Sequence, residues 1–233
     1  NIPLVEQFQQ AIFGLIPGFE DSEDRLGLAI SGGPDSLALL LLSAEIFPDR
    51  IAAATVDHQL RPEARHEAVF VARLCAERSV PHHILVPAVP IKGSIQTEAR
   101  KARYELLNNW MVKEQLDWLV TAHHADDQLE TLIMRLLRGS GIDGMSGIRA
   151  RRGHIIRPLL QISKNILKDY VAAQGYEAVD DPSNRDHNYD RVRVREALSH
   201  LHGFDVGLAN QSAAALGDAR EAIQWMVEEL ANK

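Results

Sequence analysis

The sequence predicts an α/β fold, a parallel five-stranded sheet with helices on both faces, followed by a helical C-terminal segment. Two observations lead to this prediction. Short apolar runs alternate along the chain with longer segments of helical periodicity, which is typical of parallel sheets. A glycine turn at residues 31–36 joins the first apolar run directly to a helical segment. In such sheets ligands bind beyond the carboxyl ends of the strands, where the strand order reverses, and we expect a site there.

Each element follows from its own pattern. An N-terminal helix is expected over residues 4–16, because Val5, Phe8, Ile12 and Phe13 recur at helical spacing. Apolar runs predict strands at 26–30, 51–56, 82–86 and 118–121, and a short edge strand at 154–156. Helices are expected after the glycine turn, and at 62–78, from 94 to 110 or beyond, at 125–138 and at 163–174.

The second half of the chain contains two predicted loops. Residues 139–147 include four glycines and indicate a loop or a lid, and residues 180–190 indicate a polar loop. From Arg191 onward the pattern is helical and ends in an amphipathic segment at 213–230. We expect a catalytic domain over residues 1–195, with residues 196–233 as a helical extension or the start of a linker to a further domain.

Composition indicates an ordinary globular protein. In 233 residues, 45% are hydrophobic and 24% charged, and no apolar stretch reaches the roughly 18 residues of a membrane span. We therefore expect a cytoplasmic protein without a membrane partner, in which a homodimer is one option for assembly. The single cysteine, Cys75, excludes an internal disulfide and is expected to be a buried, inert thiol.

The distribution of charge indicates a nucleic-acid partner although the net charge is −7. Residues 138–195 contain 11 Lys and Arg but 7 Asp and Glu, so this stretch is basic on an acidic protein. Such a stretch is either a surface that faces a polyanion or a solvated basic face.

The turn at residues 31–36 reads Ser-Gly-Gly-Pro-Asp-Ser and has the features of a phosphate site. Two glycines let the backbone approach a ligand, and the start of a helix aims N–H groups and a positive dipole end at one point. The turn lacks the lysine of a Walker loop and the three spaced glycines of a dinucleotide loop. It therefore predicts a different kind of phosphate loop.

A second candidate site follows the strand at 118–121. His123 ends that strand, and Asp127 and Glu130 lie three residues apart on the next helix, near its N-terminus. Carboxylates in this arrangement can hold Mg²⁺ or a cationic amine. Two alternatives stay open, an acid-rich first turn that only caps the helix, and a transition-metal site built on His123 and Asp127.

These motifs together resemble a known family. The SGGxDS turn is similar to the phosphate loop of the N-type ATP pyrophosphatases, which cut ATP between its α- and β-phosphates. Further blocks resemble the tRNA(Ile)-lysidine synthetase family within that group, and Val192 and Met145 depart from its usual residues, Asn and Leu. These blocks are residues 56–61, Glu98 to Arg100 with Arg103 and Tyr104, residues 123–131, 138–141, 157–160 and 181–184.

The resemblance implies a fold like that of the adenine nucleotide alpha hydrolases and a ligase activity. Members of the family use ATP and Mg²⁺ to adenylate the C2 oxygen of the wobble cytidine in isoleucine tRNA with a CAU anticodon. The ε-amine of free L-lysine then displaces AMP.

The resemblance also assigns roles to residues of this chain. ATP would be bound by Ser31, Gly32, Gly33, Pro34, Asp35, Ser36, Asp57 and His123. Asp35 would lie near the metal, Arg100 and Arg103 would clamp phosphates, and Asp127 and Glu130 would take the lysine ammonium or metal; of these, Asp35, Asp127, Glu130, Arg100 and Arg103 are the predicted catalytic residues. The expected tRNA contacts are Arg149, Arg151, Arg152, Arg191, Arg193 and Arg195.

Other functions make different demands on the sequence. A sulfur-inserting tRNA enzyme normally needs catalytic cysteines, which Cys75 alone does not supply. An amidotransferase would need a glutaminase nucleophile. A module that binds nucleotide or tRNA without catalysis stays open, and release of pyrophosphate that depends on tRNA would exclude it.

Overall fold

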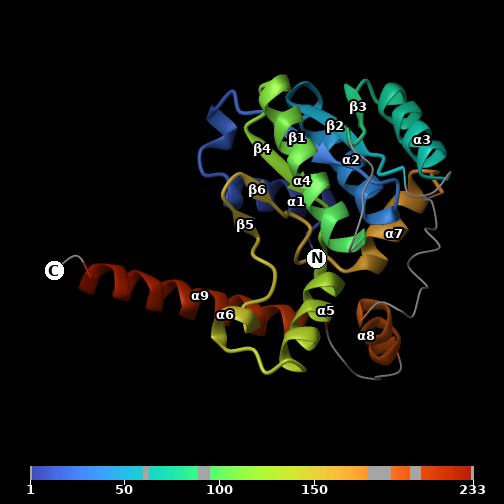
Figure 1. Ribbon diagram of the computed structural model, residues 1–233. Helices are drawn as coiled ribbons and strands as arrows, with labels where there is room; N and C mark the ends of the chain where they lie inside the picture. The colour runs from blue at the N-terminus through green and yellow to red at the C-terminus, as the bar shows by residue number, and fades with distance from the viewer. Residues whose placement is uncertain (1, 60–62, 89–94, 178–189, 200–205, 232–233) are drawn as a thin grey trace. The chain divides into compact units, whose positions relative to one another are not determined.

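The computed structural model describes residues 2–59, 63–88, 95–177, 190–199 and 206–231 (Figure 1). They form two compact units. The first contains the chain up to Ala122, Arg151–Leu159 and the segment from Asn165; the second contains His123–Ala150, Leu160–Lys164 and the C-terminal helices. The chain passes between the units several times, and the domain boundary expected after residue 195 stays a prediction.

The first unit is built on a six-stranded sheet of order β3-β2-β1-β4-β6-β5. Its strands are β1 (Leu26–Ala29), β2 (Ile51–Val56), β3 (His82–Leu85), β4 (Trp118–Thr121), β5 (Arg151–Arg152) and β6 (Ile155–Ile156). Five strands are parallel, which confirms the predicted fold class, and β5 pairs antiparallel with β6. The edge position expected for residues 154–156 is therefore wrong, because β5 occupies that edge.

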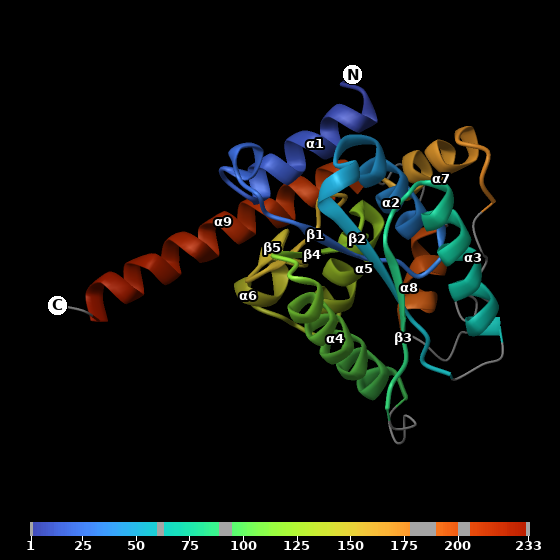
Figure 2. The ribbon, with the colours of Figure 1, turned by 90° about the horizontal axis from the view of Figure 1, so that it is seen from above.

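Helices cover both faces of this sheet (Figure 2). Figure 2 shows α4 on one side of the sheet and α1, α2, α3 and α7 on the other. Their bounds are α1 Leu4–Leu15, α2 Pro34–Ile46, α3 Glu63–Glu77, α4 Ile95–Glu114 and α7 Lys164–Ala173, with single turns of 3₁₀-helix at Phe19–Asp21 and Pro48–Arg50. These bounds match the helices expected from periodicity.

The core between α4 and the sheet is made of small strand residues and large helix residues. Ala29, Ala52 and Ala54 pack with Leu107 and Trp110 in one buried cluster. The opposite face holds α2, whose residues from Leu37 to Leu42 are all buried. Each such leucine contributes about 1.5–3 kcal/mol of hydrophobic free energy. This packing fixes the strand ends, and so positions the loops that leave them.

The glycine of β1 has a packing reason. A Cβ on Gly27 would lie 2.9 Å from the Trp110 ring, closer than carbon atoms pack, so a side chain there would push α4 off the sheet.

The second unit is helical. It contains α5 (Ala125–Leu136), α6 (Ile142–Met145), α8 (Asp190–Ser199) and α9 (Val206–Ala231), and α5 packs against the other three. The stretch 139–147 was expected to hold no regular element, and α6 corrects this. The stretch predicted as a polar loop at 180–190 lies almost wholly outside the described residues.

The loop after α6 is tied to α5 by one side chain. Gln128 is buried, and its amide nitrogen donates to the carbonyl of Ile148 while its oxygen accepts the Ile148 N–H. Gly147 has a φ of +68°, and a Cβ there would meet the Gln128 side chain. Glycine is therefore needed at this position for two reasons, backbone conformation and space.

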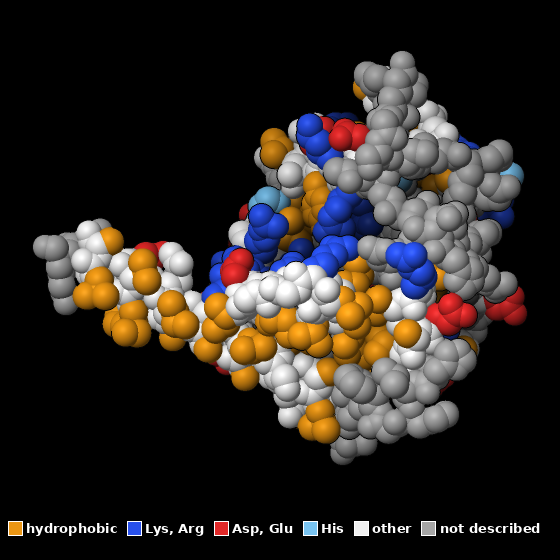
Figure 3. Space-filling model, turned by 60° about the horizontal axis from the view of Figure 1, so that its bottom comes forward, with side chains coloured by type: hydrophobic (Ala, Val, Ile, Leu, Met, Phe, Trp, Pro, Cys, Tyr) orange, Lys and Arg blue, Asp and Glu red, His pale blue; other side chains and the backbone are white. Residues whose placement is uncertain are grey.

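The C-terminal part of α9 lies exposed. Asn210 and Ala213 are buried near its start, whereas every side chain from Glu221 to Ala231 is exposed. Hydrophobic side chains line this part of the helix (Figure 3). They are Ile223, Trp225, Met226, Val227 and Leu230. None of the helices in the described ranges is long and apolar enough to cross a membrane.

Candidate functional site

The turn between β1 and α2 is organised around one hydroxyl. Ser36 is buried, and its Oγ accepts the N–H groups of Ser31 (3.2 Å) and Gly32 (3.1 Å) and donates to the carbonyl of Gly33 (2.9 Å). The Ser31 hydroxyl also donates to it, at 3.3 Å. These contacts fold residues 31–33 over the start of α2.

The start of α2 is suited to an anion. Gly33 precedes the helix, Pro34 is its first residue, and no described side chain caps this end. Gly32 has a φ of +94°, a conformation that glycine adopts without strain. The N–H groups of the first turn and the positive end of the helix dipole therefore point out of the turn. Asp35 lies in this first turn and is half-buried.

The sheet order places this turn at a switch point. The chain runs from β1 outward through β2 to β3 and then returns to β4, which lies on the other side of β1. Ala29 is in register with Thr121, so β1 and β4 end at the same level. The turn therefore leaves the carboxyl edge where α/β proteins bind ligands, as the sequence predicted.

Asp57 follows the neighbouring strand β2 and is buried. Its N–H donates to the carbonyl of Leu85 at 2.9 Å, and its Oδ1 accepts the N–H of Gln59 at 2.9 Å. Asp57 is a predicted ATP-binding residue, and one of its carboxylate oxygens thus shapes the loop after β2. Burial and the nearby charge of Arg103 lower the pKa of the next residue, His58, while Asp57 opposes the shift.

The predicted phosphate clamps lie on α4. Arg100 is exposed and its guanidinium lies 5.2 Å from the centre of the Tyr104 ring. Burial lowers the pKa of Arg103, Tyr104 opposes this shift, and the like charge of Arg100 adds to it. The two arginines and Tyr104 therefore form one group at the first turns of the described α4.

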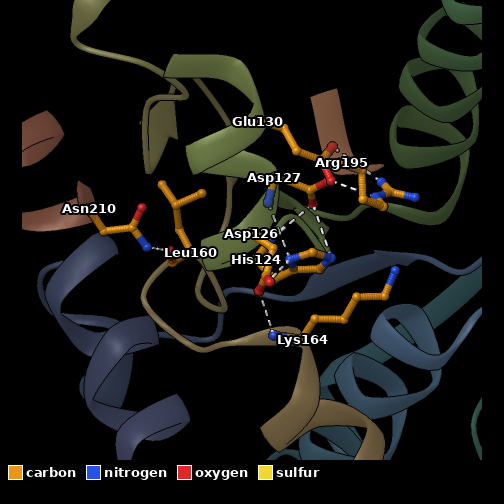
Figure 4. Close-up of polar contacts among 8 residues, drawn as sticks. All are labelled: His124, Asp126, Asp127, Glu130, Leu160, Lys164, Arg195 and Asn210. Carbon is orange, nitrogen blue, oxygen red and sulfur yellow. Dashed lines mark hydrogen bonds and ion pairs between the residues drawn. The ribbon is translucent and has the colours of Figure 1, made fainter. Parts of the chain in front are cut away.

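In the second unit, His124 and Asp127 form the N-terminal cap of α5 (Figure 4). Asp127 Oδ2 accepts the N–H of His124 at 3.1 Å, and His124 Nδ1 accepts the N–H of Asp127 at 3.3 Å. Because Nδ1 is an acceptor, the neutral ring carries its proton on Nε2, which lies 3.5 Å from Asp127 Oδ2. The predicted site residue Asp127 is thus held by the backbone and the ring of His124. This arrangement agrees with the alternative in which the carboxylate caps the helix. The second carboxylate oxygen, Oδ1, takes no part in the cap.

The remaining two carboxylates of this helix have different partners (Figure 4). Asp126 accepts the N–H of Lys164, the first residue of α7, at 2.8 Å. Glu130 is buried and pairs with Arg195 of α8, whose Nε lies 2.6 Å and whose Nη2 lies 3.2 Å from its two oxygens. Arg195, expected as a tRNA contact, is therefore a partner of the carboxylate expected to bind lysine. His123 leads into this helix and is half-buried.

The other predicted tRNA contacts are mostly exposed. Arg149 lies 3.6 Å from Asp143, and Arg152 and Arg193 are exposed. Arg151 also has an internal role, because it donates to the carbonyl of Leu15 and its guanidinium lies 4.6 Å from the Trp118 ring centre. The sixth predicted tRNA contact is Arg191, whose side chain is not among those that the structure describes.

A hollow of about 400 Å³ lies between α5 and α8. It is lined by Ile133, Met134, Leu137, Arg138, Arg193, Val194, Ala197 and Leu198. Its wall is mainly apolar and includes neither Asp127 nor Glu130. We therefore do not assign the lysine substrate to it.

The described residues contain no group of three or more His, Cys, Asp or Glu that could hold a metal. Cys75 is buried, and burial raises its pKa to about 12, so the thiol stays protonated. The predicted burial of this thiol is confirmed.

Three side chains near the sites were given no role from the sequence. They are His124, Tyr104 and Arg157. Tyr104 and Arg157 stand inside blocks that carry the family resemblance, and this was the signal that could have drawn attention to them. His124 directly follows another histidine, His123, and only the hydrogen bonds of the folded chain show that His124 is the one that caps α5.

Comparison with solved structures supports the fold. A U34-tRNA thiolase, NcsA, from Methanococcus maripaludis with its [4Fe-4S] cluster matches 91% of this chain and 77% of its own, with a TM-score of 0.74 at 16% identity. An NH3-dependent NAD synthetase from Campylobacter jejuni matches 94% of this chain and 93% of its own, with a TM-score of 0.51 at 15% identity. At these identities the likeness concerns the fold alone.

Comparison with protein sequences identifies the family. The model of the PP-loop domain matches residues 4–201. Curated tRNA(Ile)-lysidine synthases from Novosphingobium aromaticivorans, Ruegeria pomeroyi and Zymomonas mobilis are 43%, 42% and 39% identical over 90%, 86% and 97% of this chain. The chain spans 67%, 50% and 70% of their lengths. The loop at residues 31–36 is thus a PP-loop, and the chain belongs to the tRNA(Ile)-lysidine synthase family of PP-loop enzymes.

Proposed function

We propose that this chain catalyses the ATP-dependent ligation of lysine to C2 of the wobble cytidine in isoleucine tRNA with a CAU anticodon. The reaction passes through an adenylated cytidine and releases pyrophosphate and AMP. It takes place in the cytoplasm. The single observation that supports it best is the PP-loop at the switch point of the sheet, in a chain whose relatives are tRNA(Ile)-lysidine synthases.

In the first step the C2 oxygen of the cytidine attacks the α-phosphorus of ATP. A phosphorus–oxygen bond to the cytidine forms, and the bond between the α-phosphorus and the bridging oxygen of the β-phosphate breaks. The electron pair leaves with pyrophosphate, so negative charge grows on the leaving group. The N–H groups of the PP-loop and the dipole of α2 stabilise that charge because they are fixed before the reaction. Arg100 and Arg103 supply positive charge from α4.

The residues present fit Mg²⁺ bound together with a nucleotide. Mg²⁺ in such sites is held by one or two carboxylates and by substrate phosphates, and Asp35 in the first turn of α2 supplies one carboxylate. When bound, the ion would neutralise charge on the phosphates.

In the second step the neutral ε-amine of lysine attacks C2. A carbon–nitrogen bond forms, the bond between C2 and the adenylate oxygen breaks, and AMP leaves with the electron pair while the amine loses a proton. Asp127 and Glu130 hold the lysine as carboxylates on one face of α5. Arg195 keeps Glu130 in place, because a bidentate arginine fixes both of its oxygens.

The test is the incorporation of radiolabelled lysine into RNA. The chain is incubated with ATP, Mg²⁺, labelled lysine and a transcript of the isoleucine tRNA with a CAU anticodon. We expect label in the RNA, and one pyrophosphate released for each lysine incorporated. The matched control is the same transcript with a GAU anticodon, which removes the target cytidine and should take up no label.

Two results would contradict the proposal in different ways. Binding of ATP without release of pyrophosphate in the presence of both transcript and lysine would make the chain a binding module. Equal labelling of both transcripts would show that the wobble cytidine is not the acceptor.

A further inference from the structure

A group of positive side chains lies on the α4 side of the sheet, near its carboxyl edge. Arg157 directly follows β6, and its side chain is hydrogen-bonded to Tyr104 of α4, which places it on this side of the sheet. His58 follows β2 and lies close enough to Arg103 of α4 for the charge of that arginine to lower the pKa of His58. β1 and its neighbour β4 lie between β2 and β6 in the sheet, so the PP-loop leaves the edge between His58 and Arg157.

Arg157 is held rigidly in this group. Only 7% of its surface is exposed, which is unusual for an arginine. Its guanidinium donates a hydrogen bond to the Tyr104 hydroxyl, and Tyr104 is itself packed against the core cluster. An arginine with a buried stem and a fixed fork loses little conformational entropy when it binds an anion.

The neighbouring charges are of the same sign. Burial lowers the pKa of Arg157, Tyr104 opposes the shift, and the charges of Arg100 and Arg152 add to it. Arg103 belongs to the same group, because the charge of Arg100 lowers the pKa of Arg103 and the charge of Arg103 lowers the pKa of His58. Holding several arginines together costs free energy, and a bound anion would offset that cost.

We propose that Arg157 joins Arg100 and Arg103 in a subsite for a phosphoryl group, and that Tyr104 is the positioning residue that orients Arg157. The proposed function enters this inference at one point, the source of the phosphoryl group. That source is either the nucleotide or the RNA backbone. Planar guanidinium groups bind two phosphate oxygens at once, so the subsite prefers phosphate to a halide.

The test measures two affinities for Arg157→Gln, Arg157→Lys and Tyr104→Phe in the full chain. Calorimetry gives the affinity for ATP and for pyrophosphate. Fluorescence anisotropy gives the affinity for the tRNA transcript over a series of salt concentrations. Arg73→Gln is the matched control, because Arg73 is exposed on α3 and its loss changes the net charge equally.

We expect Arg157→Gln to weaken binding of one phosphoryl ligand about 10-fold or more, since a charge-assisted pair of hydrogen bonds is lost. If ATP and pyrophosphate bind more weakly and the transcript does not, the nucleotide supplies the phosphoryl group. If the transcript binds more weakly, with a salt slope smaller by about 1, and ATP does not, the RNA backbone supplies it. Unchanged affinity for all three ligands overturns the proposal.

Tyr104→Phe separates positioning from general packing. The phenylalanine ring keeps the contacts with the core and removes only the hydroxyl, so we expect a loss of affinity of about 3-fold or more in the wild-type background. In the Arg157→Gln background the same change should have no effect on affinity. Equal losses in both backgrounds would show that Tyr104 does not act through Arg157.

Folding and function are checked separately. Circular dichroism and thermal unfolding identify any variant that fails to fold. If Arg157→Gln does not fold, Arg157→Lys keeps the charge without the fork and should still bind the ligand more weakly than the wild type. A wild-type chain that binds pyrophosphate through Arg157 but forms no lysidine would contradict the proposed reaction and leave the subsite intact. Lysidine formation with unchanged binding in every variant would contradict the subsite alone.

Discussion

At the scale of single residues, the PP-loop shows how one hydroxyl organises an anion site. The Ser36 oxygen lies inside the turn and contacts the backbone of three residues, so the N–H groups of the turn are oriented before any ligand arrives. Preorganisation of this kind removes the cost of ordering the loop during binding. The serine at the end of the hexapeptide is therefore as important to the site as its glycines.

We predict that Ser36→Ala lowers both ATP affinity and stability. The change leaves the N–H of Gly32 without its acceptor in a buried position, which costs about 1–3 kcal/mol. Thermal unfolding and ATP calorimetry measure the two effects. Ser43→Ala is the matched control on the same helix, because the Ser43 hydroxyl is buried without a hydrogen-bond partner among the described residues. Its loss should leave ATP affinity unchanged, and equal effects of the two substitutions on ATP affinity would contradict the role given to Ser36.

The sequence indicated which residues belong to the sites better than it indicated which side chains contact one another there. Asp127 and Glu130 were expected on one helix face because their spacing is local. The ion pair between Glu130 and Arg195 spans 65 positions, and no local pattern encodes it. Arg157 and Tyr104 were missed as a pair for the same reason, since the contact depends on how α4 packs against β6.

At the scale of elements, local patterns predicted long elements and missed short ones. Each long strand and helix carries an apolar period that shows where it will be buried. The two arginines of β5 carry no such period, and their strand exists only because β6 offers an edge to pair with. The four-residue helix α6 arises in a stretch whose glycines indicate a loop, and its single turn is closed by backbone hydrogen bonds from Met145 to Gly141 and from Ser146 to Ile142.

Strand β3 gives a prediction about pH. Burial, and then the charge of His83, lower the pKa of His82 to about 4, and its Nε2 lies 2.9 Å from the Thr55 hydroxyl of β2. The unfolded chain binds this proton at the ordinary histidine pKa of 6.5, so it takes up more protons than the folded chain between pH 6.5 and about 4. Stability therefore falls as pH decreases through this window.

We expect His82→Gln to reduce this loss of stability, which amounts to a few kcal/mol at most. Urea unfolding at pH 7.5 and at pH 5 measures it as the difference in unfolding free energy between the two values of pH. His66→Gln on the exposed face of α3 is the control and should keep the wild-type difference. If His82→Gln keeps it as well, His82 is not the group that titrates.

At the scale of the whole molecule, the order of strands could be expected in part. A parallel sheet with a ligand at its carboxyl edge follows from the alternation of elements, and the turn after the first strand marks the switch point. The return of the chain from β3 to the other side of β1 follows from no local feature, because it depends on which faces α3 and α4 cover. The exposed C-terminal part of α9 was predicted as a helix from the spacing of its apolar residues. That spacing does not show which surface the apolar side of the helix covers.

The net charge of the molecule and the charge of its basic stretch lead to opposite expectations for tRNA binding. A net charge of −7 repels RNA at long range, so binding must come from phosphate contacts within a Debye length of about 8 Å in physiological salt. Arg149 and Arg193 are exposed members of the basic stretch in the second unit. If they contact RNA phosphates, each releases counterions from the RNA when it binds.

We predict that the double variant Arg149→Gln with Arg193→Gln weakens binding of the tRNA transcript and reduces the slope of log affinity against log salt by about 1 to 2. ATP affinity should not change, because neither residue belongs to the PP-loop or to α4. The control pairs Arg73→Gln with Arg65→Gln, two exposed positions on α3, and alters the net charge by the same amount. An equal loss in both double variants would mean that the RNA responds to net charge alone. A smaller slope only in the first locates the phosphate contacts on the basic stretch, which is how an acidic protein can bind a polyanion.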